Sequence, residues 1–214
     1  MTTHSDTFIL SKQGWLPIAF AATFFLFFVI TQLTFLIFIS GTFLIAFLIL
    51  FRNPERNSAL NEPLTILSCI DGVVLGVEEA LINERNMKKV TVLNSLWDVS
   101  LLRSPFDGEM EGYKIRHGLS LGLHHPLSES LNEKAAISFK SLEGNEIFIE
   151  HVSSESCFSL RIDAGIGEKM REGSRYGFLA RGRTICYLPT NVDLNIHAGS
   201  DVRAGETVLG HFKS

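Results

Sequence analysis

The sequence predicts a mostly β protein, a compact β sandwich or barrel-like domain preceded by an N-terminal transmembrane helical hairpin. Two observations carry this prediction. Residues 13–51 hold no formal charge over 39 positions and, with their neighbours, 11 of the 17 Phe of the chain. Residues 57–214 instead alternate short apolar runs with turn pairs such as Asp71-Gly72, a pattern typical of strands joined by tight turns. We therefore divide the chain into a tail and two-helix anchor, 1–56, and a β domain, 57–214.

The charge-free run is long enough for two membrane-spanning helices, which we place at roughly 15–32 and 35–51. One span needs about 20 residues, because about 30 Å of hydrocarbon is crossed at about 1.5 Å per residue. We expect the tight turn near Thr31–Thr34; a break at 40–42 and a single strongly tilted helix are the alternatives. The run is much longer than the apolar core of a signal peptide, which has about 7–15 residues.

Basic residues flank the run and are absent from the expected turn. Lys12 precedes the run, while Arg52 and Arg56 follow it. Because Lys and Arg are enriched on the cytoplasmic side of a membrane, both ends should be cytoplasmic. We therefore expect a protein of the cytoplasmic (inner) membrane whose β domain faces the cytoplasm.

The region after the anchor contains at least seven predicted strands and little helix, except for a turn or two around Ser128–Ala135. The predicted strands are Thr65–Ser68, Val73–Val77, Val90–Leu93, Ala136–Lys140, Glu146–Glu150, Ser159–Ile162 and Arg183–Leu188.

Composition excludes some classes of function. The net charge of −4 argues against a nucleic-acid partner, because neutralising phosphates requires a clustered basic surface. The three cysteines, Cys69, Cys157 and Cys186, are far apart and have no zinc-ligand spacing. We expect reduced thiols and no metal site.

Five segments, in order behind the apolar run, resemble motifs of the phosphatidylserine decarboxylase family, in its short membrane-anchored form. They span most of the chain and are Phe51–Arg56; Ser68–Gly72, like Ser-Pro-Ala-Asp-Gly; Trp97–Pro105, like Phe-Asn-Val-His-Val-Asn-Arg-Ala-Pro; Asn132–Lys134, like Asn-Glu-Arg; and Tyr187–Pro189.

This resemblance implies removal of the carboxylate from a phosphatidylserine headgroup, which gives phosphatidylethanolamine. It also implies a pyruvoyl group made by self-cleavage of a Gly-Ser bond, with an Asp and a His assisting. The serine hydroxyl attacks the preceding carbonyl, and elimination from the resulting ester leaves a ketone that traps the substrate amine.

The chain departs from the family pattern at the cleavage site. Aligned from the left, Gly182-Arg183 replaces the Gly-Ser pair; aligned from the right, Arg181-Gly182 does. Neither register contains a serine, and arginine has no hydroxyl for the acyl shift. Ser100 stands where the resemblance places the base His, so Asp71 is the member of the three that the chain retains.

Other groups near the C-terminus offer hydroxyls or imidazoles, and a shifted cleavage bond stays open as an alternative. An isolated His is more often a solvated or core residue than a base. The groups are Gly173-Ser174, Gly199-Ser200, Thr184, His124, His125 and His151.

Four arginines are candidates for contact with lipid phosphate: Arg52, Arg56, Arg103 and Arg161. The first two follow the apolar run and should lie at the bilayer surface, where each basic residue contributes about 1 kcal/mol of attraction to anionic lipid. Topological anchoring explains Arg52 and Arg56 equally well, and a surface strand explains Arg161.

The sequence therefore predicts a membrane protein of phospholipid metabolism that has lost self-processing and has no pyruvoyl cofactor. We expect it to bind a phospholipid, with an anionic headgroup, or to form a homo-oligomer or a complex with an active paralogue. The alternatives are an active phosphatidylserine decarboxylase with a displaced cleavage site, and a membrane-tethered β adaptor without a lipid role.

Overall fold

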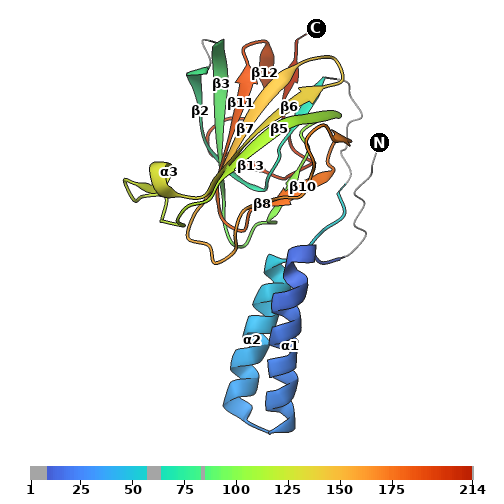
Figure 1. The fold of residues 1–214 in the computed structure, drawn as a ribbon, viewed down its shortest axis with the longest axis vertical. Helices are drawn as coiled ribbons and strands as arrows, with labels where there is room; N and C mark the ends of the chain where they lie inside the picture. The colour runs from blue at the N-terminus through green and yellow to red at the C-terminus, as the bar shows by residue number, and fades with distance from the viewer. Residues whose placement is uncertain (1–8, 57–63, 83–84, 214) are drawn as a thin grey trace. The chain divides into compact units, whose positions relative to one another are not determined.

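The structure is a computed structural model that describes residues 9–56, 64–82 and 85–213. The chain separates into two compact units. The helical unit is Asp6–Glu55, and the β unit takes the chain from Arg56 to Ser214. Figure 1 shows helices in the first and strands in the second.

The helical unit is a hairpin of two helices. A short 3-10 turn, η1 (Lys12–Gly14), leads into α1 (Trp15–Ile30), and α2 (Thr34–Leu50) follows. Gln32 in the connecting turn has a φ of 56°, in the left-handed region that sharp reversals use. The prediction of two helices is confirmed, and the chain turns at 31–33, whereas residues 40–42 lie inside α2.

Both helices of the hairpin are apolar, which suggests membrane anchoring. The helix Lys12–Ile30, counted with η1, is long and apolar enough to cross a membrane, and Thr34–Leu50 is a shorter apolar helix. Hydroxyls within them donate to carbonyls one turn back, as Ser40 Oγ does to Leu36 O at 2.7 Å and Thr23 Oγ1 to Ala19 O at 2.9 Å. Such internal bonds are what polar groups require where no water is present.

Eight antiparallel strands form the main sheet of the β unit, which curls into a half-barrel (Figure 1). Their order across the sheet is β13-β2-β3-β11-β7-β6-β5-β9. In chain order they are β2 (Gly72–Ile82), β3 (Arg85–Asn94), β5 (Gly108–Arg116), β6 (Lys134–Ser141), β7 (Glu146–Ser153), β9 (Lys169–Met170), β11 (Gly182–Pro189) and β13 (Asp201–Val202).

Two three-stranded antiparallel sheets accompany the half-barrel. One has the order β1-β14-β12 and the other β4-β10-β8. Their strands are β1 (Thr65–Leu67), β4 (Leu101–Arg103), β8 (Arg161–Ile162), β10 (Arg175–Phe178), β12 (Val192–Leu194) and β14 (Val208–Phe212), while α3 (Ser128–Leu131) is a single helical turn.

The core fills the inside of the half-barrel because its strands alternate. In β6, Ala135, Ile137 and Phe139 are buried, while the residues between them point outward. Phe139 contacts Tyr176 and Phe106 edge to face, with ring centroids 5.2 and 6.5 Å apart. Aromatic contacts of this kind link the half-barrel to the smaller sheets and set the position of the loops at its ends.

Each of the seven predicted segments contains a strand, and α3 confirms the short helical stretch. The observed strands are longer: β2 runs over Gly72–Ile82, where the sequence predicts 73–77. The sequence does not predict β4, β5 or the two-residue β9. The prediction of a mostly β domain is confirmed. The sequence predicts a sandwich or a barrel, and the structure has a curled half-barrel sheet.

Candidate functional site

The positions that the resemblance assigns to self-cleavage, Asp71, Ser100 and Gly182-Arg183, lie at one end of the half-barrel, which we call the Asp71 end. Here β2 begins after Asp71, β3 ends at Asn94 and β11 begins at Gly182. Asn94 and Gly182 are direct neighbours across β3 and β11, and Gly182 pairs with Ser153 of β7 on its other side. Residues far apart in the sequence therefore form one row across four adjacent strands.

Asp71 is held by an ion pair with Arg56. Asp71 Oδ2 accepts from Arg56 Nη2 at 2.7 Å, and Oδ1 accepts from Arg56 Nη1 and from the Ala204 N–H. The side chains of Arg56 and Asp71 are 7% and 10% exposed. Arg56 also donates to Ala204 O at 2.9 Å. Both oxygens of the carboxylate are thus engaged by a bidentate guanidinium.

The charge of Arg56 is stable in this setting. Burial lowers the pKa of Arg56, but the hydrogen bond and charge of Asp71, together with the charge of Glu206, outweigh burial and raise it. Sequence reasoning assigned Arg56 to the bilayer surface; the structure places its guanidinium on Asp71.

Asn94 is a site residue that the sequence analysis missed. It is fully buried, and its Nδ2 donates to the backbone carbonyl of Asp71 at 3.1 Å. Its Oδ1 has no hydrogen-bond partner among the residues that the structure describes. The sequence offers one signal for Asn94, a polar residue at the end of an apolar strand. That signal does not reveal the partner, because Asp71 lies 23 positions away in the sequence.

Gly182 fits its position because neighbouring backbone is too close for a side chain. A Cβ at this residue would lie 2.1 Å from the Val152 carbonyl oxygen, far inside contact distance. The backbone therefore leaves room for glycine alone at residue 182. Arg183 follows it in β11, between Leu93 of β3 and Val152 of β7.

A backbone hydrogen bond connects Ser100 to the segment that leads to Gly182. Ser100 is buried, and its carbonyl accepts from the N–H of Leu179, three residues before Gly182. The fold thus brings positions 71, 100 and 182–183 to one end of the sheet, as the resemblance implies. The side chains present there include a hydroxyl at 100 and a guanidinium at 183, and no imidazole at either.

His151 is a buried imidazole, which the sequence analysis interpreted as a solvated or core residue rather than a base. Its Nδ1 lies 2.8 Å from Thr184 Oγ1 and its Nε2 2.8 Å from the Tyr176 hydroxyl. Burial lowers the pKa of His151 from near 6.5 to about 3, so the ring is neutral at pH 7. Burial also raises the pKa of Tyr176. The cluster is therefore uncharged, and it links β7, β10 and β11.

The remaining candidates are placed as follows. Arg103 is 3% exposed, and its Nη1 donates to Gly173 O at 3.0 Å. Arg161 is exposed on β8, opposite Phe178 of β10. Arg52 belongs to the helical unit, where its Nη1 donates to Ile49 O at 3.0 Å. Within the described residues, no group of three His, Cys, Asp or Glu is arranged to hold a metal ion.

The alternative hydroxyls have distinct surroundings. Ser200 Oγ lies 3.2 Å from Nδ1 of His197 in an exposed turn, and the preceding Gly199 has a φ of 88°. Thr184 contacts His151 but lies in β11 with a strand on each side. The backbone N–H of Ser174, which follows Gly173, donates to Arg171 O at 3.0 Å, as in a tight turn.

Comparison with known proteins bears on this arrangement. Residues 43–210 match the family described as phosphatidylserine decarboxylase. The phosphatidylserine decarboxylase proenzyme of Geobacter sulfurreducens is 28% identical over 208 residues, which cover 95% of this chain and 88% of that protein. The proenzymes of Nitrosomonas eutropha (27% identical, 96% of each chain) and Amoebophilus asiaticus (28%, 77% of this chain and 74% of that one) are similar as well.

Proposed function

Because the chain belongs to the phosphatidylserine decarboxylase family, we propose that it is a membrane-anchored relative in phospholipid metabolism that does not cut itself. In this proposal it is a non-catalytic protein that binds an anionic phospholipid headgroup or regulates an active paralogue. The observation that carries the proposal is the pair Gly182-Arg183: backbone contact reserves the first position for glycine, and the second has no hydroxyl.

The family works through a pyruvoyl group that is generated from its own chain. The group supplies an electron sink for decarboxylation, and making it requires a serine hydroxyl beside the bond that breaks. The residues at the Asp71 end do not fit that requirement. Arg183 has no hydroxyl that could attack the carbonyl of Gly182, and Ser100 cannot act as the proton acceptor that an imidazole would be.

Asp71 has a structural role in this proposal. Its carboxylate is paired with Arg56 and bonded to the backbone of Ala204, so its charge is already neutralised. A carboxylate that supports a base normally orients an imidazole. Here it instead fixes the first residue of the β unit to the turn before β14.

The proposed lipid contact rests on the arginine that faces solvent. Arg161 is exposed, whereas Arg56 and Arg103 are buried with bonded guanidinium groups. Arg52, next to the apolar helices, supplies charge at the bilayer surface, where it also anchors the topology.

Decarboxylation by the purified full-length chain tests the proposal. We expect no CO₂ release from phosphatidylserine in mixed micelles, with the Geobacter sulfurreducens proenzyme as the reference. Release of CO₂ by this chain would refute the non-catalytic assignment. Photocrosslinking of the vesicle-reconstituted full chain to an anionic phospholipid with a photoreactive headgroup, for the wild type and Arg161→Ala, tests the headgroup contact; equal crosslinking of both proteins would favour the adaptor alternative.

A second candidate, an active decarboxylase cut at Gly199–Ser200, has one observation in its favour. Ser200 is a serine preceded by glycine, and its hydroxyl lies 3.2 Å from the His197 imidazole, which is the kind of contact that activates a nucleophile. Ser200→Ala would abolish cleavage in that case, whereas Ser174→Ala, at the other Gly-Ser pair near the C-terminus, would leave it intact.

A further inference from the structure

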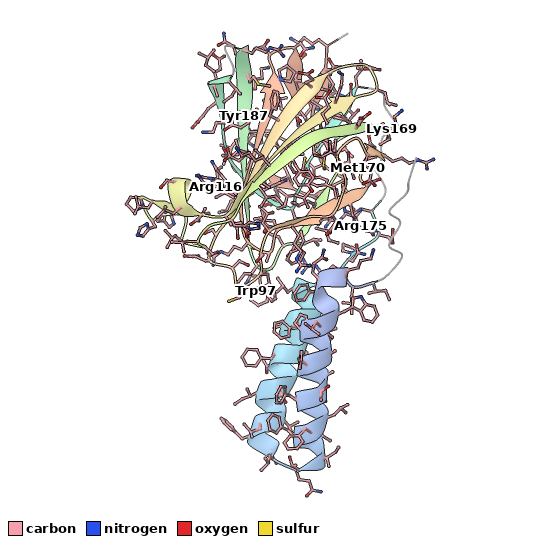
Figure 2. All side chains as sticks on the ribbon, in the orientation of Figure 1. Trp97, Arg116, Lys169, Met170, Arg175 and Tyr187 are labelled. Carbon is pink, nitrogen blue, oxygen red and sulfur yellow. The ribbon has the colours of Figure 1, made fainter. Side chains whose placement is uncertain are left out.

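Two loops at the Asp71 end expose large apolar side chains. The first follows β3 and carries Trp97, which is 70% exposed, beside Leu96. The second joins β5 to β6 over residues 117–133 and exposes Leu119, Leu127 and Leu131. We call residues 95–100 and 117–133 the Asp71-end loops. Figure 2 shows Trp97 at the lower end of the β unit, whereas Tyr187 lies higher on the sheet.

Strand register places both loops at one end of the half-barrel. β3 ends at Asn94, beside Gly182, and Gly182 pairs with Ser153 at the end of β7. One residue earlier in β7, Val152 pairs with Lys134, and Lys134 pairs with Arg116 at the end of β5. The two loops therefore leave the sheet at the same end as Asp71, with β11 and β7 between the strands that carry them.

The chain enters the β unit at this same end. Arg56 is the first residue of the β unit, directly after the helical unit, and its guanidinium is fixed to Asp71. Only residues 51–55 separate the end of α2 from Arg56 in the sequence. A surface that combines exposed leucines with an exposed tryptophan, in a chain that also carries an apolar hairpin, has the composition of a membrane interface. Trp suits that position because its ring is apolar and its indole N–H can bond to headgroups or water.

We propose that the Asp71-end loops rest on the bilayer, with Trp97 at the depth of the headgroups and the exposed leucines beside it. The occupant of this surface is a lipid bilayer. The proposal rests on anchoring by α1 and α2, and it holds whether or not the chain cuts itself.

The contact is mainly apolar, because the loops expose Trp97 and four leucines, while two charged pairs lie at this end and Asp98 accepts a hydrogen bond from the Ser95 N–H. Arg181 bonds Glu155 at 2.7 Å, and His117 bonds Glu133 at 3.0 Å. An apolar interfacial contact depends weakly on salt and on anionic lipid, in contrast to a polybasic surface. Zwitterionic vesicles are therefore a sufficient probe.

Quenching of Trp97 fluorescence by brominated lipid tests the proposal. The full-length chain with Trp15→Phe, so that Trp97 is the remaining tryptophan, is placed in phosphatidylcholine vesicles brominated near the glycerol end of the acyl chains. We expect a large loss of Trp97 emission relative to unbrominated vesicles, with its maximum at a shorter wavelength than in the unfolded chain. The difference between the wild type and Trp97→Phe gives the same signal without altering Trp15.

The matched control moves the tryptophan to the opposite end of the sheet. Leu142, 66% exposed in the turn after β6, becomes Trp in a chain with Trp15→Phe and Trp97→Phe. Quenching at position 97 but not at 142 supports the contact. No quenching at either position, or equal quenching at both, overturns it. Failure of the chain to float with vesicles would instead overturn the anchoring, which separates the two outcomes.

Discussion

In the function that we propose, the carboxylate of Asp71 has a structural role. A buried ion pair adds little to stability relative to an apolar replacement, but removing one partner leaves the other charge buried and unpaired. Arg56 and Asp71 are in that situation, since both side chains are at most 10% exposed. The account therefore predicts a large effect of changing Asp71 on stability.

Asp71→Asn should lower the free energy of unfolding by about 3 kcal/mol, because the Arg56 charge stays buried without a counter-ion. The exposed pair Lys89–Glu78 provides the control, where Glu78→Gln should change stability by less than about 1 kcal/mol. Denaturant unfolding of the full chain in detergent measures both. Equal stability of the two variants would contradict the role assigned to Asp71.

Gly182→Ala should destabilise the protein by about 2–3 kcal/mol, because the new Cβ meets the Val152 carbonyl and strands β7 and β11 must separate. Gly76→Ala is the matched control, since a Cβ there has no atom within 4 Å. Thermal unfolding compares the pair. A Gly182→Ala protein as stable as Gly76→Ala would remove the argument that residue 182 must be glycine.

Some residues of the site can be identified from sequence motifs, whereas the hydrogen-bond partners of others are known only from the fold. The motifs identify Asp71, Ser100 and Gly182 one by one, and the structure shows that these residues lie at one end of the sheet. The pairing of Arg56 with Asp71, and of Asn94 with the Asp71 backbone, joins positions 15 and 23 residues apart, which only the folded chain brings together. Nothing local in the sequence signals these pairs.

At the scale of elements, three strands are connected by a polar cluster inside an apolar core. His151 on β7 bonds Thr184 on β11 and Tyr176 on β10. A buried polar cluster lowers the stability of the fold if one of its groups lacks a hydrogen-bond partner. When every group is bonded, the cluster favours a single arrangement of the core. The low pKa of His151 also makes the stability of the protein sensitive to acid.

His151 should make the protein less stable as the pH falls below about 6.5. The unfolded chain binds a proton there, whereas the folded imidazole, with a pKa of about 3, does not. This group removes about 1.4 kcal/mol of stability per pH unit between about 6.5 and 3. The difference in unfolding free energy between the wild type and His151→Gln, followed from pH 7.5 to 4.5, isolates it. A difference independent of pH would contradict a buried neutral His151.

A helix or strand can be predicted where a pattern within its own residues indicates it. The two helices follow from the length of the apolar run, and long strands such as β6 follow from alternation. β9 and β13 have two residues each, which is too short for any periodic pattern. β5 carries an irregularity between Met110 and Gly112, so its alternation is interrupted and the sequence does not predict it.

At the scale of the whole molecule, the sequence predicts what the units are, but it does not predict the order of strands. β11 lies between β3 and β7, so its neighbours come from segments that precede it by about 30 residues or more. Such long-range pairing is decided by packing over the whole sheet. The side of the membrane that the β unit faces also belongs to this scale, and the proposal of a cytoplasmic β unit rests on basic flanks.

A cysteine at position 142, in a chain with Cys157→Ser, should react with a membrane-impermeant maleimide in inverted vesicles. It should not react in intact cells until they are permeabilised. Cys69 and Cys186 are buried and provide no background, whereas Cys157 is exposed and must be removed. Labelling in intact cells would place the β unit on the opposite side.

The intact mass of the purified, denatured chain tests the central claim most directly. With glycine at 182 and no hydroxyl at 183, the account predicts one species with the mass of the uncut 214-residue chain, unchanged by hydroxylamine. A C-terminal fragment that begins at Ser174, Thr184 or Ser200, has a blocked amino terminus and gains the mass of a hydroxylamine adduct would contradict it.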